Sequence, residues 1–228
     1  MLITLESVLN PKELQRCQTL LHAASWSGGE ITAGKQSALA KNNQQLDEQS
    51  PQLGELRAIV MTALSRHAIF FSAALPKQVF PPLFNRYSGS TNSFGAHVDG
   101  AMRPLPDGRG YLRTDLSATL FLSEPASYDG GELIVADAMG ERSVKLAAGS
   151  MVLYSATTVH RVAPVTRGER LACFTWLQSM VPDDGQRHLL FEMDMALLAL
   201  RQRLGDHDSA VVALTGTYHN LLRRWGAV

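Results

Sequence analysis

A histidine and an aspartate stand two positions apart in the segment SFGAHVD, where they are His97 and Asp99. Side chains i and i+2 of a β-strand share a face, so we expect this imidazole and this carboxylate to lie together, with Val98 directed into the opposite wall. A second imidazole, His160, opens the later strand-like run VHRVAPV. Two imidazoles and one carboxylate suit iron(II) and leave coordination positions open. The His-X-Asp pattern alone is common, and an aspartate that makes a turn hydrogen bond at a strand end also explains it.

A cationic side chain follows these three residues, because Arg170 opens the apolar run RLACFTWLQSM. An arginine inside a β-barrel needs a carboxylate partner, and its planar fork holds a carboxylate with two parallel hydrogen bonds. If a 2-oxo acid chelates the iron, Arg170 is placed to hold its distal carboxylate. A surface salt bridge is the alternative for Arg170. Arg161 and Arg167 compete for the role, although neither begins an apolar run.

The strands that must carry these residues are expected between about residues 77 and 181. Short runs rich in strand formers alternate there with Gly, Pro, Asp and Ser, as in KQVFPPLFNRY, DLSATLFLS and SMVLYSA. Close spacing of this kind predicts a sandwich, barrel or jelly roll, and the lack of strand–helix alternation argues against a Rossmann or TIM fold. Trp176 shares the predicted face of Arg170 and either walls a pocket or packs in the core.

Helices are expected on both sides of the strand region. Asn10 is a predicted N-cap for a helix that begins at Pro11, and PQLGELRAIVMTALSRHAIFFSAAL is typical of one further helix. The polar segment between them, SGGEITAGKQSALAKNNQQLDEQS, is expected to be a loop. Two more helices are predicted after residue 183, separated at Gly205. The domain organisation follows from these predictions: an N-terminal support region of helices and strand (1–76), a jelly-roll domain (77–181) and a C-terminal helical extension (182–228).

Composition excludes several classes of protein. The chain has 228 residues, 45% of them apolar, which is typical of a globular protein. Lysine and arginine balance aspartate and glutamate at 21 each, so no overall field favours nucleic acid or an acidic membrane. Cys17 and Cys173 form no metal or redox motif and are expected to be buried thiols. No signal peptide or membrane span is predicted, and a cytoplasmic protein is expected.

Together, the His-X-Asp pair, the distal histidine and the following arginine resemble the iron(II)/2-oxoglutarate-dependent dioxygenases, which are built on a double-stranded β-helix. Three stretches extend the likeness: FNRYSGSTNSFGAHVDG, DLSATLFLSEPASYDGGELIV and GSMVLYSATTVHRVAPVTRGERLACFTWLQS. They resemble the prolyl 4-hydroxylase-like group and, within it, the bacterial PKHD-type hydroxylases associated with iron-uptake genes. The flanking helices also resemble that family, so the likeness covers nearly the whole chain.

The resemblance implies an iron site with three ligands: His97, Asp99 and His160. It implies that Arg170 binds the distal carboxylate of 2-oxoglutarate and that L-ascorbate keeps the iron reduced. Asn85 and Tyr87 stand two positions apart before the His-X-Asp strand, and related dioxygenases use such residues to contact 2-oxoglutarate. Ordinary strand packing is the alternative for both residues.

The expected activity is hydroxylation of a peptidyl side chain or of a small molecule related to iron uptake, with release of succinate and CO₂. A nucleobase demethylase on the same scaffold and a non-enzymatic jelly roll that binds iron or an iron chelate are the alternatives. The loop GAMRPLPDGRGYLRTD is expected over the metal, where Arg103, Arg109 and Arg113 either favour an acidic substrate or are simply solvated. No nucleic-acid or membrane partner is expected, and self-association as a homo-oligomer is left open.

Overall fold

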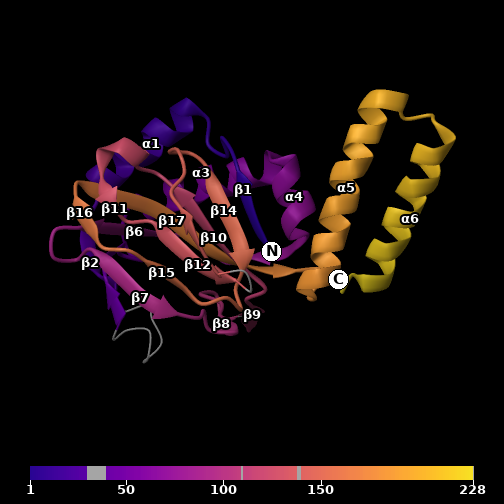
Figure 1. Ribbon diagram of the computed structural model, residues 1–228. Helices are drawn as coiled ribbons and strands as arrows, with labels where there is room; N and C mark the ends of the chain where they lie inside the picture. Colours follow the sequence, from indigo (N-terminus) through magenta and orange to yellow (C-terminus); the bar gives the residue numbers. More distant parts are fainter. Residues whose placement is uncertain (30–39, 109, 138–139, 228) are drawn as a thin grey trace.

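The computed structural model describes residues 1–29, 40–108, 110–137 and 140–227, and it consists of two antiparallel sheets with helices around them (Figure 1). The larger sheet contains, in spatial order, β1 (Leu2–Leu5), β14 (Met151–Ser155), β10 (Leu116–Phe121), β17 (Glu169–Ser179), β6 (Leu83–Ser88), β4 (Gln44–Leu46) and β2 (Trp26–Gly28), and β5 (Pro76–Val79) also pairs with β17. The smaller sheet contains β13 (Gly140–Val144), β12 (Leu133–Asp137), β15 (His160–Val162), β7 (Ser93–His97) and β3 (Lys41–Asn42). The predicted mainly-β jelly roll with flanking helices is confirmed.

Two short strand pairs and a 3₁₀ turn complete the β region. They are β8 (Met102–Pro104) with β9 (Tyr111–Arg113), β11 (Asp129–Gly130) with β16 (Val165–Arg167), and η2 (Pro125–Ser127). The first pair is a hairpin that follows the segment carrying Asp99 and lies within the stretch GAMRPLPDGRGYLRTD, which the sequence predicts to be a loop.

Side chains along β10 alternate between the core under the helices and the space between the sheets. Leu116, Ala118 and Leu120 belong to a cluster shared with the helices, whereas Ser117 and Thr119 line the space between the sheets. Successive strand residues face opposite sides, so a strand can pack on helices with one face and line a cavity with the other. The larger sheet is therefore the wall that separates the helical layer from the cavity.

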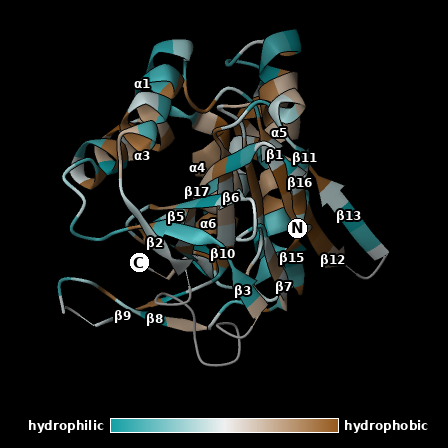
Figure 2. Cartoon of the chain, turned by 90° about the vertical axis from the view of Figure 1, so that its left-hand side faces the viewer, coloured by the Kyte–Doolittle hydropathy of each residue, from teal (hydrophilic) through white to brown (hydrophobic). Residues whose placement is uncertain are grey.

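The first helix, α1 (Pro11–His22), begins as the sequence predicts. The Asn10 side chain accepts a hydrogen bond from the Glu13 backbone N–H at 3.0 Å, and the Glu13 carboxylate accepts one from the Asn10 N–H at 3.0 Å. This reciprocal capping satisfies two backbone donors that have no partner inside the helix. Cys17 is buried on the inner face of α1. Figure 2 shows that α1 carries both hydrophilic and hydrophobic residues, as expected for a helix that covers a sheet.

The prediction of one helix over residues 51–75 is wrong, because the structure has α3 (Leu53–Arg66) and α4 (Ala68–Ala74). His67 separates them in an extended conformation (φ −87°, ψ 100°). Its Nδ1 accepts a hydrogen bond from the Phe70 N–H at 3.2 Å, so the side chain caps α4. Histidine is an uncommon cap, and the apolar period runs through the break without interruption.

Three predicted strands are shorter than expected, and the predicted loop after α1 contains strands. KQVFPPLFNRY divides into β5 and β6 around Pro81 and Pro82, and VHRVAPV divides into β15 and β16 around Pro164. Proline has no N–H to donate to a ladder, which ends the pairing at these points. The strand SFGAHVD ends at His97. Part of the predicted loop, residues 30–39, lies outside the described residues.

The last two helices, α5 (Asp184–Leu204) and α6 (Ser209–Trp225), form the predicted hairpin beside the sheets (Figure 1). Gly205 ends α5 with φ +86°, and the Asp208 side chain caps α6. The hairpin shares a small core with the end of α4 and the segment before α5, formed by Leu75, Val181, Leu190, Leu197 and Tyr218. Within the described ranges, no helix is both long and apolar enough to span a bilayer.

Candidate active site

A cavity of about 330 Å³ lies between the two sheets. Strands β6, β10 and β17 of the larger sheet and β7 and β15 of the smaller one supply most of its walls. All the site residues predicted from the sequence line it: Asn85, Tyr87, His97, Asp99, His160 and Arg170. The fold therefore brings together residues that are far apart in the chain.

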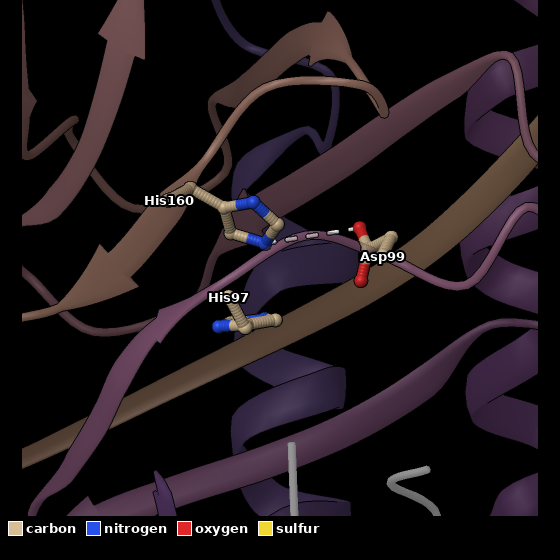
Figure 3. A group of neighbouring side chains, drawn as sticks. All are labelled: His97, Asp99 and His160. Carbon is tan, nitrogen blue, oxygen red and sulfur yellow. Dashed lines mark ion pairs between the residues drawn. The ribbon is translucent and has the colours of Figure 1, made fainter. Parts of the chain in front are cut away.

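His97, Asp99 and His160 form a compact group near one wall of this cavity (Figure 3). His160 on β15 stands opposite His97 on β7 in the strand register, and the centroids of their rings lie 4.2 Å apart. The Nε2 atom of His160 lies 3.7 Å from Oδ2 of Asp99. One ligand atom from each of the three residues lies within 4.8 Å of the others, a spacing at which a single metal ion can contact all three.

Backbone carbonyls orient both imidazole rings. Nδ1 of His97 donates to the carbonyl oxygen of Gly95 at 2.8 Å, and Nδ1 of His160 donates to that of Thr158 at 3.1 Å. A carbonyl oxygen only accepts, so the proton of each neutral ring lies on Nδ1 and the Nε2 lone pair is bare. In histidines that bind metals, such a hydrogen bond from the other ring nitrogen fixes the tautomer and the direction of the ring.

Asp99 is held by a residue that the sequence analysis missed. Its Oδ2 accepts a hydrogen bond of 2.6 Å from the hydroxyl of Ser117 on β10. Asp99 itself lies beyond the end of β7, so the strand alternation does not extend to it. For the same reason the expectation that Val98 points into the barrel wall is wrong, because Val98 is 45% exposed and lines the cavity.

The electrostatics of the group favour a neutral His97. Burial and, after it, the neighbouring His160 lower the pKa of His97 from 6.5 to about 4, against the opposing effects of the Gly95 carbonyl and of Asp99. A neutral imidazole is the form that binds a metal. The ring therefore needs no deprotonation near neutral pH before it can act as a ligand.

Arg170 lies on β17, opposite Tyr87 in the register with β6, and is only 1% exposed. Its guanidinium carbon lies 5.1 Å from the ring centroids of both Tyr87 and Phe121. Its Nε and Nη2 atoms have no hydrogen-bond partner among the described residues, and neither has the buried hydroxyl of Tyr128. A buried cation without an acidic partner is costly, so the donors of Arg170 and Tyr128 fit a ligand that brings its own carboxylate.

A glycine makes room for this arginine. Gly131 has φ +68°, and a Cβ atom added there would lie 3.0 Å from Cδ of Arg170 and 2.9 Å from the Tyr128 ring. A larger residue would meet both the strained backbone and the two side chains. Gly131 therefore shapes the space around Arg170.

Asn85 and Tyr87 face the cavity from β6, as the alternation predicts. The amide Nδ2 of Asn85 lies 3.5 Å from the Tyr87 hydroxyl, to which it donates. Oδ1 of Asn85 is buried without a partner in the described chain, and burial raises the pKa of Tyr87. Oδ1 of Asn85 is therefore available to a ligand, and the contact of both residues with 2-oxoglutarate stays a prediction.

The three arginines of the expected loop have different surroundings. Arg103 on β8 lines the cavity, whereas the fork of Arg113 is paired with Asp115 at 2.7 and 3.0 Å. Arg109 lies outside the described residues. Trp176 lines the cavity and also packs against neighbouring aromatic rings, so both of its predicted roles are combined.

Ser117, Tyr128 and Lys41 are site residues that the sequence analysis missed. The signal for Ser117 was present, because Ser117 and Thr119 interrupt an apolar strand at a spacing of two. Lys41 gave no such signal, since it stands in a polar stretch predicted as loop. The donor set near His97 fits iron(II), and the unpaired donors near Arg170 fit a carboxylate of 2-oxoglutarate.

Comparison with known families gives two matches along the chain. Residues 82–178 match the 2OG-Fe(II) oxygenase superfamily, and residues 184–227 match the PKHD-type hydroxylase C-terminal domain. Over 225 residues the chain is 60% identical to a PKHD-type hydroxylase of Nitrosomonas eutropha and 54% identical to one of Bordetella pertussis, and each alignment covers 99% of both proteins.

Solved structures with little sequence identity share the fold. A prolyl hydroxylase of Trichoplax adhaerens, solved with a peptide fragment of the hypoxia inducible factor oxygen degradation domain, has a TM-score of 0.55 at 14% identity, covering 83% of this chain and 86% of that one. The non-heme alpha ketoglutarate dependent epimerase SnoN from nogalamycin biosynthesis has a TM-score of 0.55 at 16% identity, covering 79% and 78%. Similarity at this level shows a common jelly roll and nothing about the substrate.

Proposed function

Because this chain belongs to the PKHD-type hydroxylases of the 2OG-Fe(II) oxygenase superfamily, we propose that His97, Asp99 and His160 hold its iron and that Arg170 holds its 2-oxoglutarate. The observation that carries the proposal is the meeting of three ligand atoms within 4.8 Å, in a cavity that also contains an unpaired buried guanidinium. Membership of this family makes the chain an enzyme, which removes the alternative of a non-enzymatic iron-binding jelly roll.

Each metal ligand has a defined part. His97 and His160 present bare Nε2 atoms because backbone carbonyls hold their Nδ1 protons. Ser117 donates a hydrogen bond to Oδ2 of Asp99 and holds the carboxylate beside Nε2 of His160. A set of two histidines and one carboxylate leaves the remaining positions of the ion for co-substrate and dioxygen.

The co-substrate end of the cavity depends on Arg170. Its unpaired Nε and Nη2 donors are the groups that would grip the distal carboxylate, with the Tyr128 hydroxyl as a further donor. The side chains of Asn85 and Tyr87 lie on the same wall and orient the bound acid in this proposal. Phe121 and Tyr87 cover the guanidinium with their rings and keep water away from the pair.

Bound iron(II) and 2-oxoglutarate supply the oxidative decarboxylation that releases succinate and CO₂ and hydroxylates a C–H bond of the substrate. The protein supplies the ligand directions, the grip on the carboxylate and a cavity between the two sheets. We propose a peptidyl side chain or a small molecule of iron uptake as the substrate, and L-ascorbate as the reductant that keeps the iron active. The cytoplasm is the proposed compartment, and the two buried free thiols, Cys17 and Cys173, support it.

The test measures bound iron and succinate formation in the same samples. Anaerobic protein is loaded with iron(II), washed and mixed with 2-oxoglutarate and air. Wild-type protein should hold about one iron per chain, as expected for one facial triad, and should form succinate without added substrate. Asp99→Ala and His97→Ala should lose both properties.

The matched control is His207→Ala, which removes an exposed imidazole far from the cavity in the chain and should change neither readout. If Asp99→Ala retains full iron occupancy and succinate formation, the assignment of the triad is wrong. Binding of single-stranded DNA at moderate salt tests the demethylase alternative, and tight salt-sensitive binding would favour it.

A further inference from the structure

The mouth of the active-site cavity contains an arginine that the proposed iron and 2-oxoglutarate sites do not use. Arg103 lies on β8, four positions after Asp99, and lines the same cavity as the triad. Among the residues that the structure describes, none forms a hydrogen bond or an ion pair with its guanidinium, and its Nε atom is buried. Arg113 on the partner strand of the hairpin is different, because Asp115 already occupies its fork.

Two aromatic rings hold the guanidinium of Arg103 in place. Its central carbon lies 3.3 Å from the centroid of Trp176 and 5.8 Å from that of Phe80. Stacking on an indole restrains the side chain, while the N–H groups around the edge of the planar fork stay available for a ligand in that plane. The arginine is therefore positioned before any ligand arrives.

Arg103 remains charged at neutral pH although it is partly buried. Burial lowers its pKa to about 10, against the opposing effect of Asp99. Lys41 on β3 lines the same cavity, with its ammonium 5.6 Å from the ring of Phe94 and 5.7 Å from that of Phe174. Arg103 and Lys41 therefore both bring a cationic group to the wall of the cavity that holds the triad.

The charges of the proposed reactants do not account for Arg103. Iron(II), the carboxylate of Asp99, the two carboxylates of 2-oxoglutarate and the guanidinium of Arg170 balance one another. The charge of Arg103 is left over, at the side of the cavity where Met102 and Val98 form an exposed apolar rim. A neutral substrate would leave this cation without a counter-charge in a half-buried position.

We propose that Arg103 binds an oxyanion, a carboxylate or a phosphate, on the substrate that is hydroxylated. Trp176 and Phe174 wall the same cavity and receive the apolar body of that substrate. The inference rests on the proposed function, since it takes the triad as the reacting centre. It assigns the enzyme an anionic substrate with an apolar or aromatic part.

The test measures binding without turnover. Holoenzyme with iron(II) and saturating 2-oxoglutarate is titrated calorimetrically under argon with 3-phenylpropionate, N-acetyl-L-proline, the amide of each acid, and phenyl phosphate. Wild-type protein should bind at least one of the acids or the phosphate about 10- to 100-fold more tightly than the amides, because a charge-assisted hydrogen bond is lost with the charge. Tighter binding of phenyl phosphate than of both acids identifies the oxyanion as a phosphate.

Arg103→Gln should remove the preference for the anion, and Arg103→Lys should keep part of it because it retains the charge without the planar fork. Arg113→Gln removes the same charge from the same hairpin and should keep the full preference. Equal binding of acids, phosphate and amides to wild-type protein, no binding of any anion, or a full preference in Arg103→Gln would overturn the inference. Admitting air to the wild-type sample without a probe tests the proposed function separately: absence of succinate overturns that function, whatever the probes do.

Discussion

Replacement of Arg170 by methionine should separate the effect of this arginine on the stability of the protein from its effect on 2-oxoglutarate binding. In the ligand-free protein Arg170 is 1% exposed, its Nε and Nη2 lack partners in the described chain, and the rings of Tyr87 and Phe121 lie against its charge. Methionine has similar length and no charge. The variant should therefore relieve a desolvation cost and lose the grip on 2-oxoglutarate at the same time.

The two effects can be estimated from the contacts. A buried ion costs several kcal/mol, and each of the two cation–π contacts returns about 2 kcal/mol when desolvated. The free energy of unfolding of ligand-free Arg170→Met should therefore lie between that of wild type and about 3 kcal/mol above it. Loss of a buried charge pair with the ligand costs about 2 to 5 kcal/mol, which weakens 2-oxoglutarate about 30- to 4,000-fold.

Urea unfolding under argon measures both quantities. At 2-oxoglutarate 100-fold above its Kd, wild-type holoprotein should gain about 2.7 kcal/mol, and Arg170→Met should gain almost nothing at that concentration. Arg167→Met is the matched control, because Arg167 pairs with Asp129 at an exposed site and should change the unfolding free energy by about 1 kcal/mol or less. A loss of more than about 2 kcal/mol in ligand-free Arg170→Met, or full stabilisation of this variant by 2-oxoglutarate, would refute the reasoning.

Three further predictions concern single contacts. Ser117→Ala removes the hydrogen bond to Asp99 and should weaken iron binding about 10- to 100-fold, measured by competition with a chelator; unchanged affinity would contradict the positioning role. The lowered pKa of His97 means that the unfolded chain binds its proton more readily, so the metal-free protein should lose stability as pH falls from 6.5 to about 4. In His97→Gln, the free energy of unfolding measured in urea should no longer show this contribution to its fall with pH. An unchanged dependence on pH would argue against the lowered pKa of His97. Asn10→Ala should cost about 1 kcal/mol through loss of the cap on α1, and an unfolding free energy equal to wild type would show that the cap is unimportant.

Much of the fold could be predicted because its strands have a period of two and its helices carry recognisable ends. Asn10, Gly205 and Asp208 stand where capping chemistry places them. The break at His67 could not be predicted, because the apolar pattern continues through it and the cap is an unusual one. The short strands β3 and β4 were missed because pairing with neighbours, and not apolar character, makes them strands.

The candidate site was predicted as residue types in a plausible order, and the structure adds what joins them. His97 and His160 could be paired only through the register of β7 and β15, which the sequence does not contain. Ser117 and Arg103 acquire meaning from tertiary contacts, with Asp99 and with Trp176 respectively. The roles assigned to the site residues and the domain boundaries near residues 76 and 181 stay predictions.

Anomalous diffraction at the iron edge tests the central claim most directly. Crystals of the protein grown under argon with iron(II) and 2-oxoglutarate should show one strong anomalous peak in contact with Nε2 of His97, Nε2 of His160 and the carboxylate of Asp99, with the distal carboxylate of 2-oxoglutarate on Arg170. A peak at another place in the molecule, or none beside these three residues in protein that forms succinate, would contradict the claim.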